Sequence, residues 1–196
     1  MIAPVISRFL QDHPECRISL EVENTRILLN ELDEGKLDFI LVEGFFDKQE
    51  YGFRLIREEP YIGVCRAGHD CLKGQRNLED LFSETILVRE EGSGTRAVME
   101  QVLSAYNYSV ASFSGMVEIS NFSVIKELIA AGQGISFLYE AAVKQELEEG
   151  RFGRIRIRKP CADGKQELEI TREFHLVYRK ESAFTDKWEA FYGYCR

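Results

Sequence analysis

The segment Glu91-Gly92-Ser93-Gly94-Thr95-Arg96 carries the residue types best suited to holding a small anion. It lies between an apolar, β-branched run at 85–88 and a run with helical spacing that begins at Val98. A strand, glycine-flanked hydroxyls and a helix present backbone N–H groups to a ligand at the positive end of the helix dipole. A Ser or Thr at a helix start is also an ordinary cap, worth about 1 kcal/mol to the fold. Anion binding and capping both stay open for this segment.

The same segment does not match nucleotide-binding or nucleophile motifs. No Gly-Lys-Ser/Thr follows at Walker spacing, and the third glycine of a dinucleotide fingerprint is absent. Ser93 lacks the spacing of a nucleophile elbow, and the sequence implies no histidine base for it. Glu90 and Glu91 are neighbours in an extended stretch, so their carboxylates face opposite ways. We therefore predict no catalytic residues.

Histidine and cysteine spacing predicts neither a metal site nor a cofactor. His13, His69 and His175 have no partner at ligand spacing, and each is interpreted as packed or solvated. The odd number of scattered cysteines fits a reducing compartment better than a disulfide framework. These cysteines are Cys16, Cys65, Cys71, Cys161 and Cys195.

Composition bounds the class of protein. The chain has 196 residues and 44% hydrophobic content, enough for one large domain or two lobes. A net charge of −8 argues against DNA binding by this chain alone. The one basic cluster, 151–159, alternates with apolar residues, which predicts a strand with a solvated basic face. No run is long enough to cross a bilayer and no signal peptide is visible, so we expect the cytoplasm.

Apolar spacing predicts alternating helices and strands. The first is a helix that stops near His13-Pro14, followed by a strand over 17–23, a helix capped by Asn24 or Thr25, and a strand over 39–42. Further strands are expected at 61–65, 85–89, 113–119, 134–138 and 167–179, and helices at 94–107, 124–131, 141–149 and around Phe184, Trp188 and Phe191. Strand, helix, strand with short connections is the crossover unit of a parallel sheet, so we predict an α/β fold.

Ligands of open α/β sheets bind beyond the carboxyl ends of the strands. The polar residues that follow the predicted strands are therefore candidates for a ligand site. They are Asn24, Thr25, Glu43, Glu91 to Thr95, Ser120, Asn121 and Tyr139. Seven of them are taken as ligand-binding candidates: Thr25, Glu43, Ser93, Gly94, Thr95, Ser120 and Asn121. Ser120 and Asn121 precede a helix, so they form either a second anion cradle or simply a second cap.

Motifs across nearly the whole chain carry a family resemblance. They include Phe9-Leu10-x-x-His13-Pro14 and Gly68-His69, with further blocks at 34–44, 78–81, 89–96, 124–126 and 130–135. In their order and spacing the chain resembles the effector-binding domain of LysR-type transcriptional regulators, in the branch related to sulfur-assimilation regulators.

The resemblance implies a fold like that of type-2 periplasmic binding proteins. Two Rossmann-like α/β lobes, joined by two crossover segments, would hold an effector in the cleft between them. Lobe I is expected over 1–58 plus 180–196, and lobe II over 59–179. The seven candidate residues above fall at family effector contacts. The family also implies a homodimer or tetramer whose geometry on DNA responds to the effector. DNA contact would come only through a winged helix-turn-helix that this chain lacks.

Two departures from the family pattern bear on the site. The first strand of lobe I is expected to be missing, which would leave an unpaired sheet edge. Glu43 places a carboxylate near the anion site, which favours a ligand with an amine or a neutralising arginine.

The leading hypothesis is a non-catalytic sensor of a small anionic or zwitterionic metabolite. Three alternatives stay open: a solute-binding protein of a transporter, an enzyme on the same scaffold such as a dehydratase of aromatic amino-acid synthesis, and a structural oligomerisation module.

Overall fold

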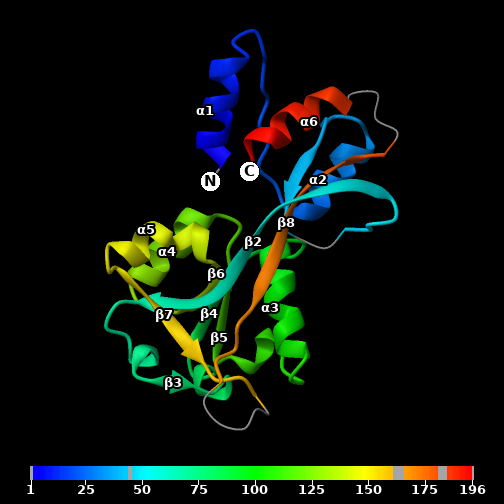
Figure 1. Cartoon of the computed structure of the whole chain (residues 1–196). Coiled ribbons are helices and arrows are strands. Elements are labelled where there is room, and N and C mark those ends of the chain that lie inside the picture. The colour runs from blue at the N-terminus through cyan, green and yellow to red at the C-terminus, as the bar shows by residue number, and fades with distance from the viewer. Residues whose placement is uncertain (1, 44–45, 161–165, 181–184, 196) are drawn as a thin grey trace. The chain divides into compact units, whose positions relative to one another are not determined.

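The computed structural model describes residues 2–43, 46–160, 166–180 and 185–195, which form two units (Figure 1). Unit 1 comprises Met1–Glu58 and Glu173–Arg196, and unit 2 comprises Glu59–Arg172. Gly44, Cys161 and Phe184, which entered the sequence analysis, lie outside the described residues. None of the helices in the described part of the chain has the length and apolar character that a membrane span needs.

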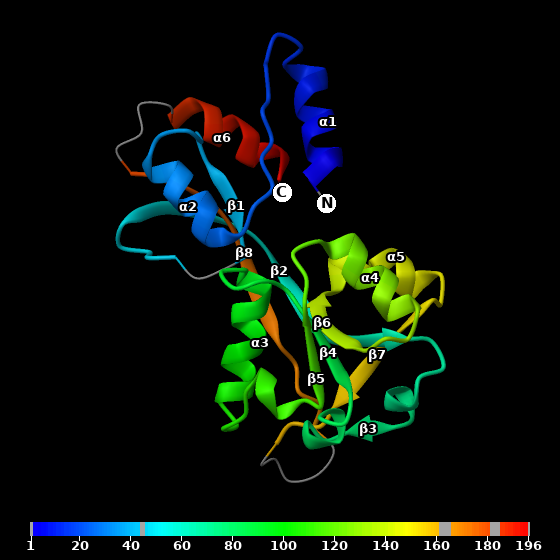
Figure 2. The same ribbon diagram turned by 180° about the vertical axis from the view of Figure 1, so that it is seen from behind.

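The parallel part of the sheet lies in unit 2. β4 (Thr85–Val88) pairs in parallel with β5 (Gly115–Glu118) and with β6 (Ile135–Tyr139), so β4 lies between them. The connections are α3 (Gly94–Ser104) and α4 (Phe122–Ala130), as the green and yellow-green ribbons show (Figures 1 and 2). α5 (Glu140–Glu148) follows β6 directly. The crossover units that apolar spacing predicted for this region are confirmed.

The antiparallel part of unit 2 uses the end of a long strand. β2 (Tyr51–Arg66) pairs through its last residues with β6 and with β7 (Phe152–Ile157). β3 (Gln75–Arg76) pairs in parallel with β7. The alternation of β7 is confirmed, because its apolar residues are buried and its arginines are exposed. Short 3-10 helices complete the unit: η1 (Asp70–Leu72), η2 (Glu79–Leu81) and η3 (Val110–Ser112).

The core of unit 2 joins the sheet to α4 and α5. It is formed by aliphatic side chains that strands and helices both contribute, among them Ile62, Leu87, Ile125, Ile129, Leu138 and Val143. The sheet is closely packed where β6 begins, since a Cβ on Gly134 would lie 2.4 Å from the carbonyl oxygen of Thr85. This close approach explains why a glycine directly precedes β6.

Unit 1 contains the two chain ends. Its helices are α1 (Ile2–Asp12), α2 (Thr25–Asp33) and α6 (Thr185–Tyr194). β1 (Ile40–Val42) pairs antiparallel with β8 (Thr171–Arg179), with Val42 opposite His175. Residues 173–179 therefore lie with unit 1, whereas the sequence analysis assigned them to the second lobe.

Two apolar clusters hold unit 1 together. One packs α2 against β1 and β8, through Leu28, Leu32, Ile40, Val42 and Val177. The other joins residues from the two ends of the chain: Phe9, Leu176, Trp188 and Phe191.

The strand predicted over 17–23 is wrong. These residues form no strand and are exposed, and Val22 reaches 83% exposure. Alternating apolar and charged residues form a strand only beside a partner, and no described strand pairs with this segment. The parallel crossover expected between this segment and β1 is therefore not formed, and β1 pairs antiparallel with β8 instead.

Candidate functional site

The carboxyl ends of β4 and β5 lie side by side in unit 2. Val88 is paired with Glu118, and the Ile119 N–H donates to the Val88 carbonyl at 2.9 Å. Because the two strands are parallel, the loops that follow them leave the same edge of the sheet. The structure thus brings the loop that ends at Ser93 and the loop of Ser120 and Asn121 to one edge.

The loop before α3 is a helix start whose capping side chain is not used. Ser93 occupies the N-cap position in extended backbone, yet its hydroxyl makes no capping hydrogen bond. Ser93 is only 4% exposed, and Gly94 and Thr95 are also buried. The Ser93 N–H donates to the Glu90 carbonyl at 3.2 Å. The donors that this loop can offer a ligand are the Ser93 hydroxyl and the first-turn N–H groups of α3.

In the loop before α4, by contrast, the side chain at the N-cap position does make a capping hydrogen bond. The Asn121 side-chain oxygen accepts a hydrogen bond from the Ser123 N–H at 2.8 Å, so Asn121 is a cap. Ser120 and Asn121 both differ from Ser93 in burial, since neither is buried. The capping interpretation is therefore confirmed for Asn121, and its amide oxygen is already engaged.

Arg96 links the first turn of α3 to the end of β5 by an ion pair. Its guanidinium forms an ion pair with Glu118 at the end of β5 and one with Glu100 at 2.7 Å. It also donates to the Arg89 carbonyl at 3.4 Å and lies 3.7 Å from a Glu91 oxygen. Burial opposes the charged form, but the carboxylates outweigh it and raise the pKa of Arg96. Arg96 thus positions both loops rather than offering its charge to a ligand.

A second arginine links the same two loops. Arg89 donates to both oxygens of Glu90, at 2.8 and 2.9 Å, and its guanidinium lies 4.3 Å from the centre of the Phe122 ring. Two guanidiniums therefore face four carboxylates here, counting those around Arg96. The local charge is not positive, so a bound anionic group would depend on N–H groups and hydroxyls.

Tyr61 is a contact residue that the sequence analysis missed. Its hydroxyl donates to the Thr95 carbonyl at 2.8 Å, and its ring lies 5.2 Å from that of Tyr139. Tyr61 is buried. The sequence did not predict this hydrogen bond, because Tyr61 and Thr95 lie 34 residues apart and only the fold brings them together.

Thr25 and Glu43 belong to unit 1. Thr25 is the buried first residue of α2, whose cap is Asn24: the Asn24 side-chain oxygen accepts from the Ile27 N–H at 3.1 Å. Glu43 directly follows β1 and is half-buried. That these two residues share one site with Ser93, Gly94, Thr95, Ser120 and Asn121 stays a prediction.

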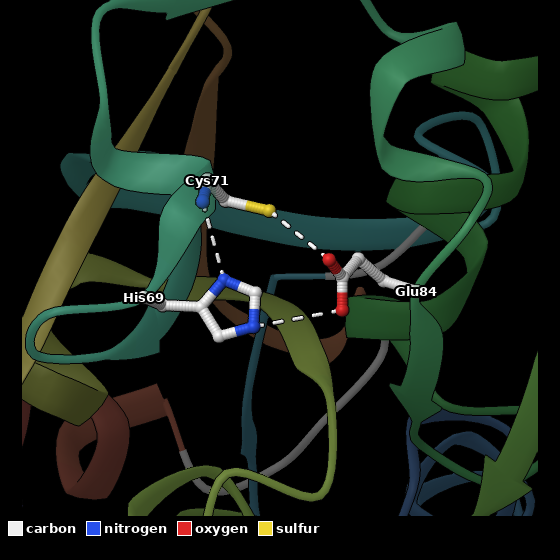
Figure 3. Close-up of side chains that lie close together, drawn as sticks. All are labelled: His69, Cys71 and Glu84. Carbon is white, nitrogen blue, oxygen red and sulfur yellow. Dashed lines mark hydrogen bonds and ion pairs between the residues drawn. The ribbon is translucent and has the colours of Figure 1, made fainter.

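One histidine has ligand-type neighbours, contrary to the sequence analysis. His69 Nδ1 accepts from the Cys71 N–H at 3.2 Å, and His69 Nε2 lies 3.6 Å from Glu84 Oε2 (Figure 3). Cys71 Sγ lies 3.6 Å from Glu84 Oε1. Burial and the Glu84 carboxylate raise the pKa of the Cys71 thiol to about 11. The signal that could have found this cluster is His-x-Cys, but Glu84 joins it only through the fold.

His175, by contrast, is packed as predicted. It is buried in β8, and its ring lies 5.4 Å from the rings of both Phe46 and Phe53. Burial and the charge of Lys48 lower its pKa, against the opposing pull of Glu173.

The loops that begin α3 and α4 thus lie at one edge of a parallel sheet, which is where ligands of open α/β proteins bind. The whole chain, residues 1–196, matches the LysR substrate binding domain family, and it belongs to that family.

Two curated relatives are transcriptional regulators. The HTH-type regulator YeiE of Escherichia coli K12 is 22% identical over 195 residues, which is 100% of this chain and 63% of YeiE. The HTH-type regulator CbbR of Rhodospirillum rubrum is 28% identical over 176 residues, covering 90% of this chain and 55% of CbbR. The chain thus spans less than two thirds of the length of these relatives.

A solved structure gives the same fold. The Synechocystis PCC6803 CcmR regulatory domain in complex with 2-PG superposes with a TM-score of 0.82 at 20% identity, covering 99% of this chain and 88% of that chain. At this identity the likeness establishes the α/β fold alone.

Proposed function

We propose that this chain is the effector-sensing part of a cytoplasmic, LysR-type transcription regulator and that it carries out no catalysis. It senses a small anionic or zwitterionic metabolite and passes occupancy to the geometry of a homodimer or tetramer. DNA contact comes through a separate winged helix-turn-helix domain. Family membership supports this proposal, as do the regulator relatives and the 2-PG complex of CcmR. A family of regulators favours this function over a transporter component or an enzyme.

The main support for the proposal is the Ser93 hydroxyl, which makes no capping hydrogen bond. A serine at an N-cap ordinarily accepts a hydrogen bond from the helix, and here it does not. Its hydroxyl sits in a buried first turn beside helix N–H groups, which is the donor arrangement that binds carboxylate, sulfate or phosphate. We therefore assign Ser93, Gly94 and Thr95 to the effector contact.

The charge around this loop narrows the ligand class. Arg89 and Arg96 are already paired, and carboxylates outnumber them. A doubly charged anion would meet repulsion here, whereas a zwitterion brings its own positive group. Within the proposed class we favour a metabolite that carries both a carboxylate and an amine.

A thermal-shift titration tests the proposal. The panel contains sulfate, phosphate, O-acetylserine and simple carboxylates, with the chain itself and its Ser93→Ala and Ser120→Ala variants. A ligand that binds only the native state raises the melting temperature as its concentration exceeds the Kd. We expect O-acetylserine, the zwitterion of the panel, to raise the melting temperature in a concentration-dependent way. Both variants should reduce this rise.

A matched control uses the other end of the same helix. Ser104→Ala changes an exposed serine in the last turn of α3 and should leave the shift intact. A shift that survives Ser93→Ala, or one that Ser104→Ala also removes, would contradict the assignment of the loop.

A further inference from the structure

Away from the Ser93 loop, three ligand-type side chains of unit 2 converge. His69 and Cys71 lie at the start of η1, and Glu84 lies just before β4, so both segments must be in place to form the group (Figure 3). One nitrogen, one sulfur and one carboxylate oxygen all lie within 4.8 Å of one another.

We propose that His69 Nε2, Cys71 Sγ and the Glu84 carboxylate bind a divalent, thiophilic metal ion, with Zn²⁺ the best match. Ligand atoms about 2.0–2.3 Å from a tetrahedral Zn²⁺ lie about 3.4–3.6 Å from one another. The Cys71 sulfur lies 3.6 Å from Glu84 Oε1, and His69 Nε2 lies 3.6 Å from the other oxygen, Glu84 Oε2. Both distances match the separation expected for two ligands of one Zn²⁺ ion.

The donor set selects the kind of ion. Sulfur with imidazole favours zinc and other thiophilic metals, whereas calcium and magnesium prefer sites built from oxygen alone. A thiolate and a carboxylate together carry two negative charges, which one divalent ion neutralises.

Binding requires two defined proton movements. The Cys71 S–H bond breaks, its proton leaves to solvent, and a metal–sulfur bond forms. The proton of neutral His69, which lies on Nε2 because Nδ1 accepts the Cys71 N–H, moves to Nδ1 so that Nε2 can offer its lone pair. Metal binding therefore breaks the hydrogen bond by which His69 caps η1 and forms a bond from His69 Nε2 to the metal.

The surroundings keep the group ordered and reachable. Cys71 is 4% exposed, while the side chains of His69 and Glu84 are 17% and 27% exposed, so the group opens on one side. Lys73 pairs with the Asp70 carboxylate at 2.7 Å, and Arg76 donates to the Asp70 carbonyl. Both contacts hold the turn that presents Cys71. A water can fill the fourth coordination position, as in other zinc sites with three protein ligands.

Cobalt substitution of the 196-residue chain tests the site without any functional assay. Co²⁺ replaces Zn²⁺ with the same geometry and reports a thiolate ligand by its sulfur-to-cobalt charge-transfer absorption. We expect one Co²⁺ per chain with that absorption, and its displacement by added Zn²⁺. Cys71→Ser should abolish the charge-transfer absorption, and Glu84→Gln should weaken binding by about tenfold or more.

The control is Cys16→Ser, which removes an exposed cysteine of unit 1 and should leave the spectrum unchanged. Circular dichroism of each variant without metal verifies folding, and Glu84→Gln keeps a readable thiolate if Cys71→Ser does not fold. Absence of thiolate absorption in the unaltered chain, its persistence in Cys71→Ser, undiminished affinity in Glu84→Gln, or its loss in Cys16→Ser would each overturn the proposal.

Discussion

Gly134 stands where β6 approaches the backbone of β4, and a side chain there would collide with the Thr85 carbonyl oxygen. Backbone cannot move aside as a flexible side chain can. We predict that Gly134→Ala lowers the free energy of unfolding by about 1–3 kcal/mol, as overpacking does in cores. Urea denaturation measures the change.

The matched control for Gly134 is another glycine with open space. A Cβ on Gly193, in α6, meets nothing within 4 Å. Gly193→Ala should therefore leave stability unchanged or raise it by about 0.5–1 kcal/mol, through helix propensity. Equal effects of the two substitutions would contradict the packing argument.

His175 should make unit 1 sensitive to mild acid. Its pKa in the folded chain lies below its ordinary value of 6.5, so the folded state favours the neutral ring. The stability it contributes is complete above pH 6.5 and is lost as the pH falls from there through the lowered pKa. We predict a melting temperature that falls over this window.

Melting curves of His175→Gln and His13→Gln isolate the effect. The first substitution should flatten the dependence on pH. The second should preserve it, because His13 is only half-buried, just beyond the end of α1, whereas His175 is buried. An unchanged slope in His175→Gln would show that another group titrates.

At the scale of elements, the three helix starts that contain candidate residues, those of α2, α3 and α4, differ in a measurable way. Asn24 and Asn121 accept capping hydrogen bonds, whereas Ser93 does not. We predict that Asn24→Ala and Asn121→Ala each cost about 1 kcal/mol of stability, and that Ser93→Ala costs less than about 0.5 kcal/mol without ligand. Chemical denaturation of the three variants measures this, and a full capping cost at Ser93 would remove the main support for a ligand role.

Elements with their own strong signal could be predicted from the sequence. The alternation of β4, β5 and β6 with α3 and α4 follows from apolar spacing, glycine at helix ends and short connections. The segment 17–23 has an equally regular alternation but forms no strand, because a strand also needs a partner. The first residues of β2 were not predicted as a strand. Charged residues and Pro60 interrupt the apolar pattern there, yet the segment still forms part of the strand.

In the candidate site, too, features set by local sequence could be predicted, whereas contacts between distant residues could not. The sequence located the Ser93 loop and the Asn121 cap, since both depend on neighbours within a few residues. It could not show that Arg96 is paired with Glu118, or that Tyr61 donates to Thr95, because the fold alone brings these residues together.

At the scale of the whole molecule, charge limits what the chain can bind. A net charge of −8 gives duplex DNA little to contact, since affinity for phosphates rises with the number of cations presented. We predict that the 196-residue chain does not retain a labelled DNA duplex at physiological salt. Fluorescence anisotropy measures this, with a known DNA-binding protein as positive control; salt-sensitive retention would contradict the prediction.

The order in which the chain is made matters for unit 1. Phe9 packs with Leu176, Trp188 and Phe191, so this core needs both ends of the chain. During translation, α1 leaves the ribosome long before its partners exist, and all of unit 2 is synthesised in between. At about 5–20 residues per second the wait is on the order of ten seconds. Nascent α1 must therefore remain without its apolar partners for that time, which makes it a natural substrate for chaperones that bind emerging chains.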